Sequence, residues 1–312
     1  VSLFNSNIKI IKVTNKQQII KNIKENCSKI KINIYNKKIA QPSTVSFVNL
    51  KTSQQLIRIH GKNHGKTTII LHGNGKNSLS TLTLQKELSK NRKVISFDLP
   101  GNGFSENIID KNNIDSYSKN LFLLLNKLRL KKVSVISFDV SASLTINTLK
   151  LNPSIFESVV LIEPIIIKSY QKKYYINNFF PNLTPNKHGT QLITAWDYLR
   201  NSKLFWPWFS TGEINIRNLP PYNNPKKIHI DFIQLMTASE TYQNYTKVCF
   251  SLNQEKIKKN INKRALLIGN KRDKVDKFRK DISEIFENPQ LIETPKHEKK
   301  LARYIEKFLD KN

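Results

Sequence analysis

Short apolar runs that alternate with helical segments constrain the fold of this chain more than any other feature. The pattern predicts strands at 66–73, 93–101, 132–138 and 157–163, separated by helices at 79–90, 114–129 and 141–151. Strands that read as continuous apolar runs are typical of parallel sheets, because helices cover both faces of such sheets. We therefore predict an α/β fold with a mostly parallel sheet and helices on both faces.

The alternation is interrupted in the second half of the chain. Residues 165–255 are rich in Pro, Asn, Tyr and Trp and contain all three tryptophans. This organisation predicts one sheet domain with an inserted helical cap. The expected parts are an N-terminal extension at 1–28, a core at 29–164 and 256–312, and the cap at 165–255. Further elements are expected as a helix at 15–26, strands at 29–35, 54–60, 263–269 and 289–294, and a last helix at 297–309.

The chain is strongly basic, with 52 Lys and Arg against 23 Asp and Glu and a net charge of +29. Such an excess is typical of proteins that bind nucleic acid or anionic membranes. Here the basic residues are spread along the whole chain without a dense block, so we favour a general enrichment in Lys and Asn over a nucleic-acid partner. No apolar run reaches the roughly 18 residues of a membrane span. With no recognisable signal peptide either, we expect a protein of the cytoplasm or of an organelle interior.

Four short motifs follow predicted strands in a fixed order. HGNG at 72–75 and DLPGNG at 98–103 end the first two strands of the alternating region, SFDVS at 137–141 joins a strand to a helix, and His297 follows the last strand. Together they resemble the α/β-hydrolase superfamily, in which a nucleophile lies on a strained turn between a strand and a helix. The resemblance spans most of residues 54–310 outside the cap.

Asp139 takes the place of the nucleophile in this turn, because Ser137 and Ser141 supply the small residues that flank it. An Asp there could also cap the following helix, and a shifted register would make Ser141 the nucleophile. That register shortens the helix, so we favour Asp139. A carboxylate attacks a saturated carbon without a base and forms an ester. Within the superfamily, this makes the chain similar to haloalkane and haloacetate dehalogenases and to epoxide hydrolases.

The resemblance implies roles for several other residues. His297 would activate the water that hydrolyses the ester, and Asp273 would orient this histidine, with Glu163 as the alternative acid. Asn74 and the backbone N–H of Val140 would form an oxyanion hole or, in a dehalogenase, contribute to halide binding. Many dehalogenases carry a Trp directly after the nucleophile, and here Val140 replaces it.

The cap is expected to close over a pocket for a small, largely apolar substrate. Trp196, Tyr198 and Trp206 are the candidates for substrate contact, and Tyr198, Tyr242 or Tyr245 would protonate the oxygen of an opening epoxide. No cofactor and no metal is implied, since the two cysteines match no metal-binding spacing.

These features predict a hydrolase that acts on a small molecule through an aspartyl-ester intermediate. Two alternatives stay open. One is a catalytically inactive protein of the same fold that serves as a basic structural or RNA-associated subunit, with which the missing glycines of the turn and the positive charge are compatible. The other is a serine esterase that uses Ser141.

Overall fold

The computed structural model describes residues 43–311 except 52, 62–65, 219–223, 239–240, 253–256, 258–260 and 296. The predicted extension at 1–28 with its helix, and the predicted strand at 29–35, lie outside the described residues.

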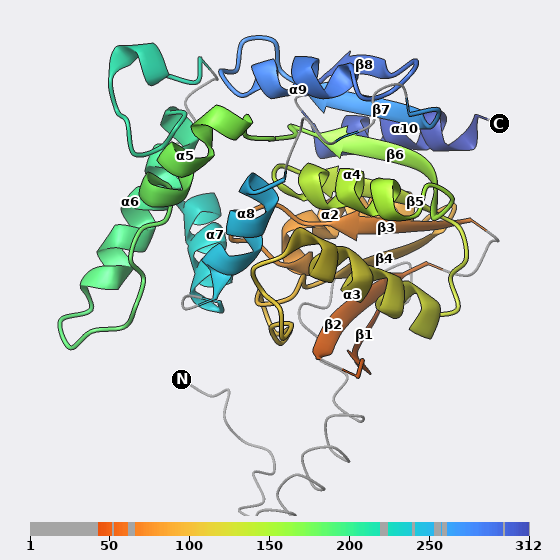
Figure 1. Cartoon of the computed structure of the whole chain (residues 1–312), viewed down its shortest axis with the longest axis horizontal. Helices are drawn as coiled ribbons and strands as arrows, with labels where there is room; N and C mark the ends of the chain where they lie inside the picture. Colours follow the sequence, from red (N-terminus) through yellow and green to blue (C-terminus); the bar gives the residue numbers. More distant parts are fainter. Residues whose placement is uncertain are drawn as a thin grey trace, which may run out of the picture. The chain divides into compact units, whose positions relative to one another are not determined.

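Within the described residues, eight strands form one sheet in the order β1-β2-β4-β3-β5-β6-β7-β8 (Figure 1). The pairings β1/β2 and β2/β4 are antiparallel, and the other five are parallel. The predicted mostly parallel sheet is thus confirmed. The strands are β1 Ser43–Asn49, β2 Gln54–His60, β3 Thr67–Leu71, β4 Lys93–Phe97, β5 Val133–Phe138, β6 Phe156–Ile162, β7 Arg264–Gly269 and β8 Gln290–Glu293.

Alternate residues of the central strands face opposite sides of the sheet. In β3, Ile69 and Leu71 belong to one buried apolar cluster and Ile70 belongs to the other. The first cluster lies under α3, α4 and α9, and the second lies under α2 and α10 (Figure 1). Because both faces are covered, these strands are apolar on both sides. These helices are α2 Leu82–Leu88, α3 Ile114–Lys127, α4 Ser141–Leu151, α9 Asp276–Ser283 and α10 Glu298–Asp310.

Most predicted elements are present near their predicted bounds, and β2 and α4 begin and end where the sequence predicts. The helix predicted at 79–90 is divided into a 3-10 turn at Ser78–Thr81 followed by α2. Outside the predicted cap, two elements were not predicted. Strand β1 lies at the sheet edge with much of its length exposed, and α9 buries only Phe278 and Ile282 as apolar residues. Neither segment carries enough buried apolar residues to produce a clear period.

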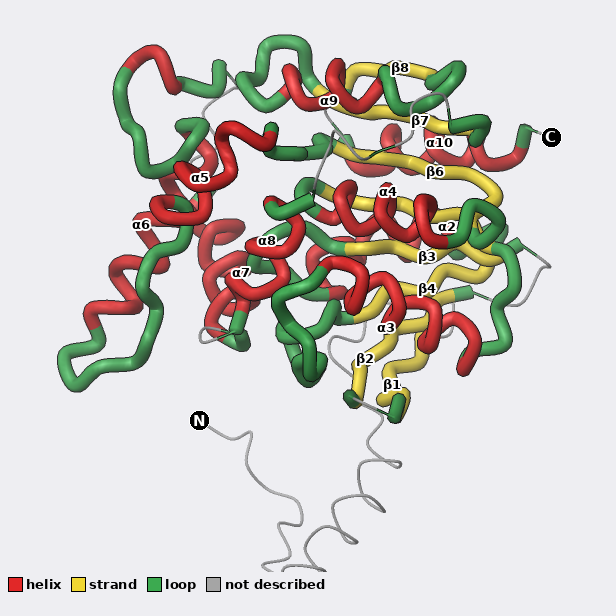
Figure 2. Tube along the Cα trace, in the orientation of Figure 1, coloured by secondary structure: helices red, strands yellow, loops and turns green. Residues whose placement is uncertain are grey.

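The connection between β6 and β7, which we call the β6–β7 insertion (residues 163–263), contains four helices among its described residues. They lie beyond the carboxyl ends of the strands (Figure 2). Residues of α6 and α7, with Tyr242 of α8, form a separate apolar cluster, whereas α5 and the rest of α8 pack into the first cluster. Ligands of open α/β sheets bind at this edge. The helices are α5 Lys172–Asn178, α6 Thr190–Leu204, α7 Pro225–Met236 and α8 Tyr242–Phe250.

No helix in the described part of the chain combines the length and the apolar character that crossing a membrane requires.

Candidate active site

Asp139 occupies a strained turn between β5 and α4. Its backbone φ is +55°, a conformation that residues other than glycine rarely adopt. The turn is held by the next strand, because the N–H of Asp139 donates to the carbonyl of Ile162 at 3.0 Å and its carbonyl accepts from the N–H of Ile165 at 3.2 Å. Strain of this kind concentrates at functional sites. The turn therefore presents one carboxylate at the carboxyl edge of the sheet.

The two oxygens of the Asp139 carboxylate have different surroundings. Oδ2 accepts a hydrogen bond from the backbone N–H of Asn74 at 3.3 Å. Oδ1 is buried and has no hydrogen-bond partner among the described residues. The turn after β3 can approach this closely only because residue 73 is glycine, since a Cβ there would lie 3.0 Å from the Cβ of Asp139. One oxygen thus accepts a hydrogen bond, and the other is buried without a partner among the described residues.

Burial raises the pKa of the Asp139 carboxyl above its ordinary value, and the negative charge of Glu163 acts in the same direction. The backbone N–H groups of Asn74 and Val140 and the positive charge of Arg217 oppose this rise. These donors and Arg217 stabilise the ionised form, which is the form that can act as a nucleophile.

Ser141, the nucleophile of the shifted register, is fully buried at the first turn of α4. Its hydroxyl donates to the carbonyl of His72 and accepts from the Tyr245 hydroxyl. These two hydrogen bonds hold the Ser141 hydroxyl within the core. Ser141 is not among the residues that line the adjoining cavity.

A cavity of about 150 Å³ lies between the strand ends and the β6–β7 insertion. Of the aromatic residues predicted to contact substrate, Tyr198 and Trp206 line it, whereas Trp196 packs against Phe232 outside it. The described residues that line the cavity are Asn74, Lys76, Asp139, Glu163, Ile165, Phe179, Tyr198, Leu199, Ser202, Lys203, Trp206, Trp208, Arg217 and Val275.

The side chain of Asn74 links the core to the insertion. Its Nδ2 donates to the Tyr198 hydroxyl, and its Oδ1 accepts from the Thr246 hydroxyl at 2.6 Å. Asn74 therefore faces Asp139 with its backbone N–H and not with its amide. Of the three predicted proton-donating tyrosines, Tyr198 lines the cavity, while the hydroxyls of Tyr242 and Tyr245 are bonded elsewhere.

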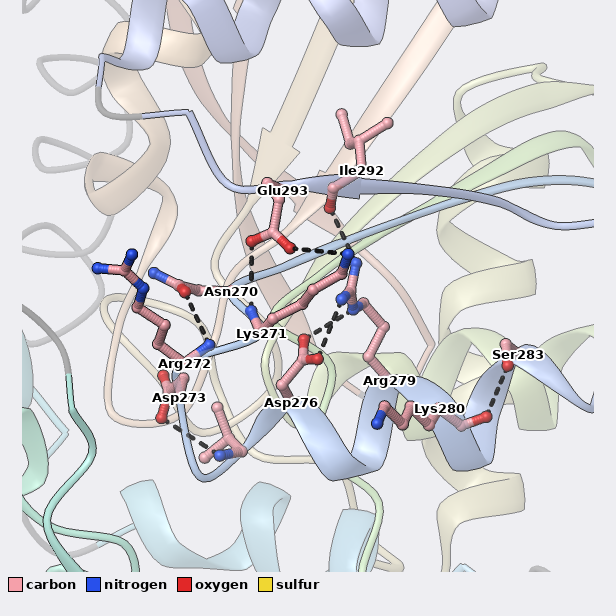
Figure 3. Close-up of polar contacts among 11 residues, drawn as sticks. Asn270, Lys271, Arg272, Asp273, Asp276, Arg279, Lys280, Ser283, Ile292 and Glu293 are labelled. Carbon is pink, nitrogen blue, oxygen red and sulfur yellow. Dashed lines mark hydrogen bonds and ion pairs between the residues drawn. The ribbon is translucent and has the colours of Figure 1, made fainter.

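Asp273, the favoured acid of the predicted triad, is paired with an arginine. Nε of Arg217, from the insertion, lies 3.0 Å from Oδ1 of Asp273, and a second guanidinium nitrogen contacts Oδ2. Arg217 also donates to the carbonyl of Ser202 at 2.8 Å. In the loop after β7, Asp273 accepts from the backbone N–H of Val275 at 3.2 Å (Figure 3). Both members of the ion pair are buried, with 14% and 1% of their side chains exposed.

The carboxylate of Asp276, three residues further along the chain, is paired with a different arginine, Arg279. Arg279 donates to its Oδ2 at 3.0 Å and to the carbonyl of Ile292 at 2.9 Å (Figure 3). This pair joins α9 to β8 and leaves Asp276 without a part in the cavity.

His297 was predicted to open the last helix, and it is the exposed residue that immediately precedes α10. It is not among the residues that line the cavity, and neither are His60, His72, His188 and His229. His72 is buried with its ring nitrogens at 3.0 Å from the N–H of Leu99 and 2.9 Å from the carbonyl of Gly73. The structure therefore brings Asp139, Glu163 and Arg217 together at the cavity and places His297 elsewhere.

Sequence analysis missed three basic residues of the cavity, namely Arg217, Lys76 and Lys203. Lys76 and Lys203 share the buried carboxylate of Asp231 on α7. Burial lowers the pKa of Lys76 to about 8, with the charge of Lys203 acting in the same direction and that of Asp231 opposing it. Lys76 directly follows the HGNG motif, but no local pattern distinguishes any of the three from the many other basic residues.

Comparisons with known proteins agree with the fold. A family model described as alpha/beta hydrolase fold matches residues 67–215. The structure is similar to an enol-lactonase of Burkholderia xenovorans, with a TM-score of 0.66, 13% identity, and coverage of 85% of this chain and 100% of that one. It is also similar to epoxide hydrolase A of Mycobacterium thermoresistibile, with a TM-score of 0.63, 15% identity, and coverage of 85% and 98%.

One curated relative matches part of the sequence. Over 133 residues the chain is 24% identical to the dihydrolipoyllysine-residue acetyltransferase component of the acetoin cleaving system of Pseudomonas putida, which is 43% of this chain and 36% of that protein. The chain thus spans about a third of the length of that relative. The family match over residues 67–215 and the similar structures together show that the chain has the α/β-hydrolase fold.

Proposed function

We propose that this protein is a hydrolase in which Asp139 attacks a small, largely apolar substrate and forms an aspartyl ester. The observation that carries the proposal is the difference between the surroundings of the two oxygens of the Asp139 carboxylate. Oδ2 is held by a backbone N–H, while Oδ1 is buried without a hydrogen-bond partner among the described residues. Asp139 lines the cavity, and a desolvated carboxylate at such a place is suited to nucleophilic attack.

The remaining groups fit the same reaction. Oδ1 would attack a saturated carbon, and the Tyr198 hydroxyl would donate a proton to the departing oxygen of an epoxide. The ester carbonyl would then lie with its oxygen at the N–H groups of Asn74 and Val140, where negative charge develops when water attacks. Trp206, Trp208 and Phe179 make one part of the cavity wall aromatic, and this part favours an apolar group of the substrate.

The names of similar structures support this reaction class without fixing the substrate. They include an epoxide hydrolase and an enol-lactonase, and both names describe small molecules as substrates.

A substrate panel tests the proposal. Incubation with terminal epoxides, haloalkanes and haloacetates should give product or a covalent adduct, and peptide mass mapping should place the adduct on the segment that contains Asp139. Ser141→Ala should retain this reactivity, because the Ser141 hydroxyl points into the core. An adduct on Ser141, or loss of reactivity in a folded Ser141→Ala variant, would favour the serine esterase.

A catalytically inactive protein is the second candidate, and two observations favour it. The carboxylate of Asp273 is paired with Arg217, and none of the described histidines lines the cavity. Absence of adduct and product across the whole panel, in a folded protein, would support this candidate.

A further inference from the structure

We propose that Glu163, and not His297, activates the water that hydrolyses the Asp139 ester. This inference rests on the proposed function, because it assigns the second step of the same reaction.

Glu163 is the counterpart of Asp139 on the neighbouring strand. In the parallel pairing of β5 with β6, Phe138 lies opposite Ile162, so Asp139 and Glu163 are the first residues beyond the two strand ends. Adjacent strands lie about 4.8 Å apart. Glu163, like Asp139, has a positive φ, at +47°. Two strained acidic residues therefore leave the sheet side by side at the same edge.

The carboxylate of Glu163 is accessible for proton transfer. Glu163 lines the same cavity as Asp139, and the two charges interact. Among the described residues, no group donates a hydrogen bond to its carboxylate, whereas Asp273 and Asp231 each have cationic partners. An ionised carboxylate is an acceptor only, so it can take a proton from water.

Other titratable residues of the cavity are less suited to this step. Lys76 contacts Asp231 and, with a pKa of about 8, is mostly a cation at neutral pH, so it donates and does not accept. Arg217 is permanently charged and paired. None of the described imidazoles lines the cavity.

Formation of the ester also changes the charge beside Glu163. Esterification removes the negative charge of Asp139, and with it the repulsion between the two carboxylates. Water then attacks Cγ of Asp139 while Glu163 takes one of its protons, and the charge that develops on Oδ2 faces the N–H group of Asn74. When the bond from Cγ to the alkyl oxygen breaks, that oxygen takes the proton back from Glu163 and leaves as an alcohol. Asp139 is left as a carboxylic acid and loses its proton to solvent.

The test compares Glu163→Gln with His297→Gln, using 1,2-epoxyhexane and 1-bromobutane as probes. We expect Glu163→Gln to form the Asp139 ester and to hydrolyse it about 10² to 10⁴ times more slowly than wild type, so that the ester accumulates in intact-mass spectra. Because ester formation needs the assembled site, the adduct itself shows that the variant is folded. His297→Gln should release product at the rate of the wild type.

A second variant separates a catalytic role from a structural one. Glu163→Ala leaves space for a small carboxylate, and added formate should accelerate ester hydrolysis in this variant but not in Glu163→Gln. Accumulation of the ester in His297→Gln with normal turnover in Glu163→Gln would overturn the inference while leaving Asp139 as the nucleophile. Absence of ester and product in the wild type and in both variants would overturn the proposed function, and this inference with it.

Discussion

Arg217→Ala is expected to lower the free energy of unfolding by about 3–5 kcal/mol, because it leaves the Asp273 carboxylate buried without its cation. Asp273 is 1% exposed at the side chain, so water cannot replace the lost guanidinium. The change also removes the hydrogen bond to the Ser202 carbonyl, by which Arg217 connects the loop after β7 to α6. Urea denaturation monitored by tryptophan fluorescence would measure the loss.

Two controls make this measurement specific. Arg200→Ala removes an arginine of α6 whose partner Asp197 is about half exposed, and it should cost no more than about 0.5 kcal/mol. Asp273→Asn, added to Arg217→Ala, should restore part of the stability, since a neutral amide costs less to bury than an unpaired carboxylate. A loss below about 1 kcal/mol for Arg217→Ala would show that solvent screens the pair.

Asp139→Asn is expected to lower the rate of covalent reaction by at least about 10³-fold, because an amide oxygen is a poor nucleophile. The substitution is nearly isosteric, and the amide oxygen can still accept from the N–H of Asn74. The fold should therefore be retained. Stopped-flow or quenched mass spectrometry with an epoxide or haloalkane that reacts with the wild type measures the rate.

The matched control for this variant is Asp197→Asn, an amide substitution on the half-exposed part of α6. It should react like the wild type. Equal reactivity of Asp139→Asn and Asp197→Asn would show that the nucleophile is another residue.

The layered fold could be predicted from the sequence because it follows from local pattern. Apolar runs such as that of β3 record burial on both faces of the sheet, and the small residues around Asp139 mark a turn that brings strand, helix and HGNG loop close together. The edge strand β1 lacks such a pattern, because two of its three apolar residues, Val45 and Phe47, are exposed.

The candidate site could be predicted only in part, for a physical reason. The position of Asp139 depends on one turn, whereas the Arg217–Asp273 pair joins residues 56 positions apart in loops without periodic pattern. For His297, the position in the chain could be predicted but the surroundings of the side chain could not. Its place after β8 was predicted, but the direction of its side chain depends on how the start of α10 packs, and that residue is exposed.

A single turnover in heavy-oxygen water, with enzyme in excess over substrate, tests most directly the claim that Asp139 forms the ester. In the ester pathway, the first product takes its new oxygen from Asp139, and the oxygen of water enters the Asp139 carboxylate. We therefore expect heavy oxygen in the peptide that contains Asp139 and ordinary oxygen in the product. Heavy oxygen in the first product, together with an unlabelled Asp139 peptide, would contradict the account, because it would show that water attacks the substrate directly.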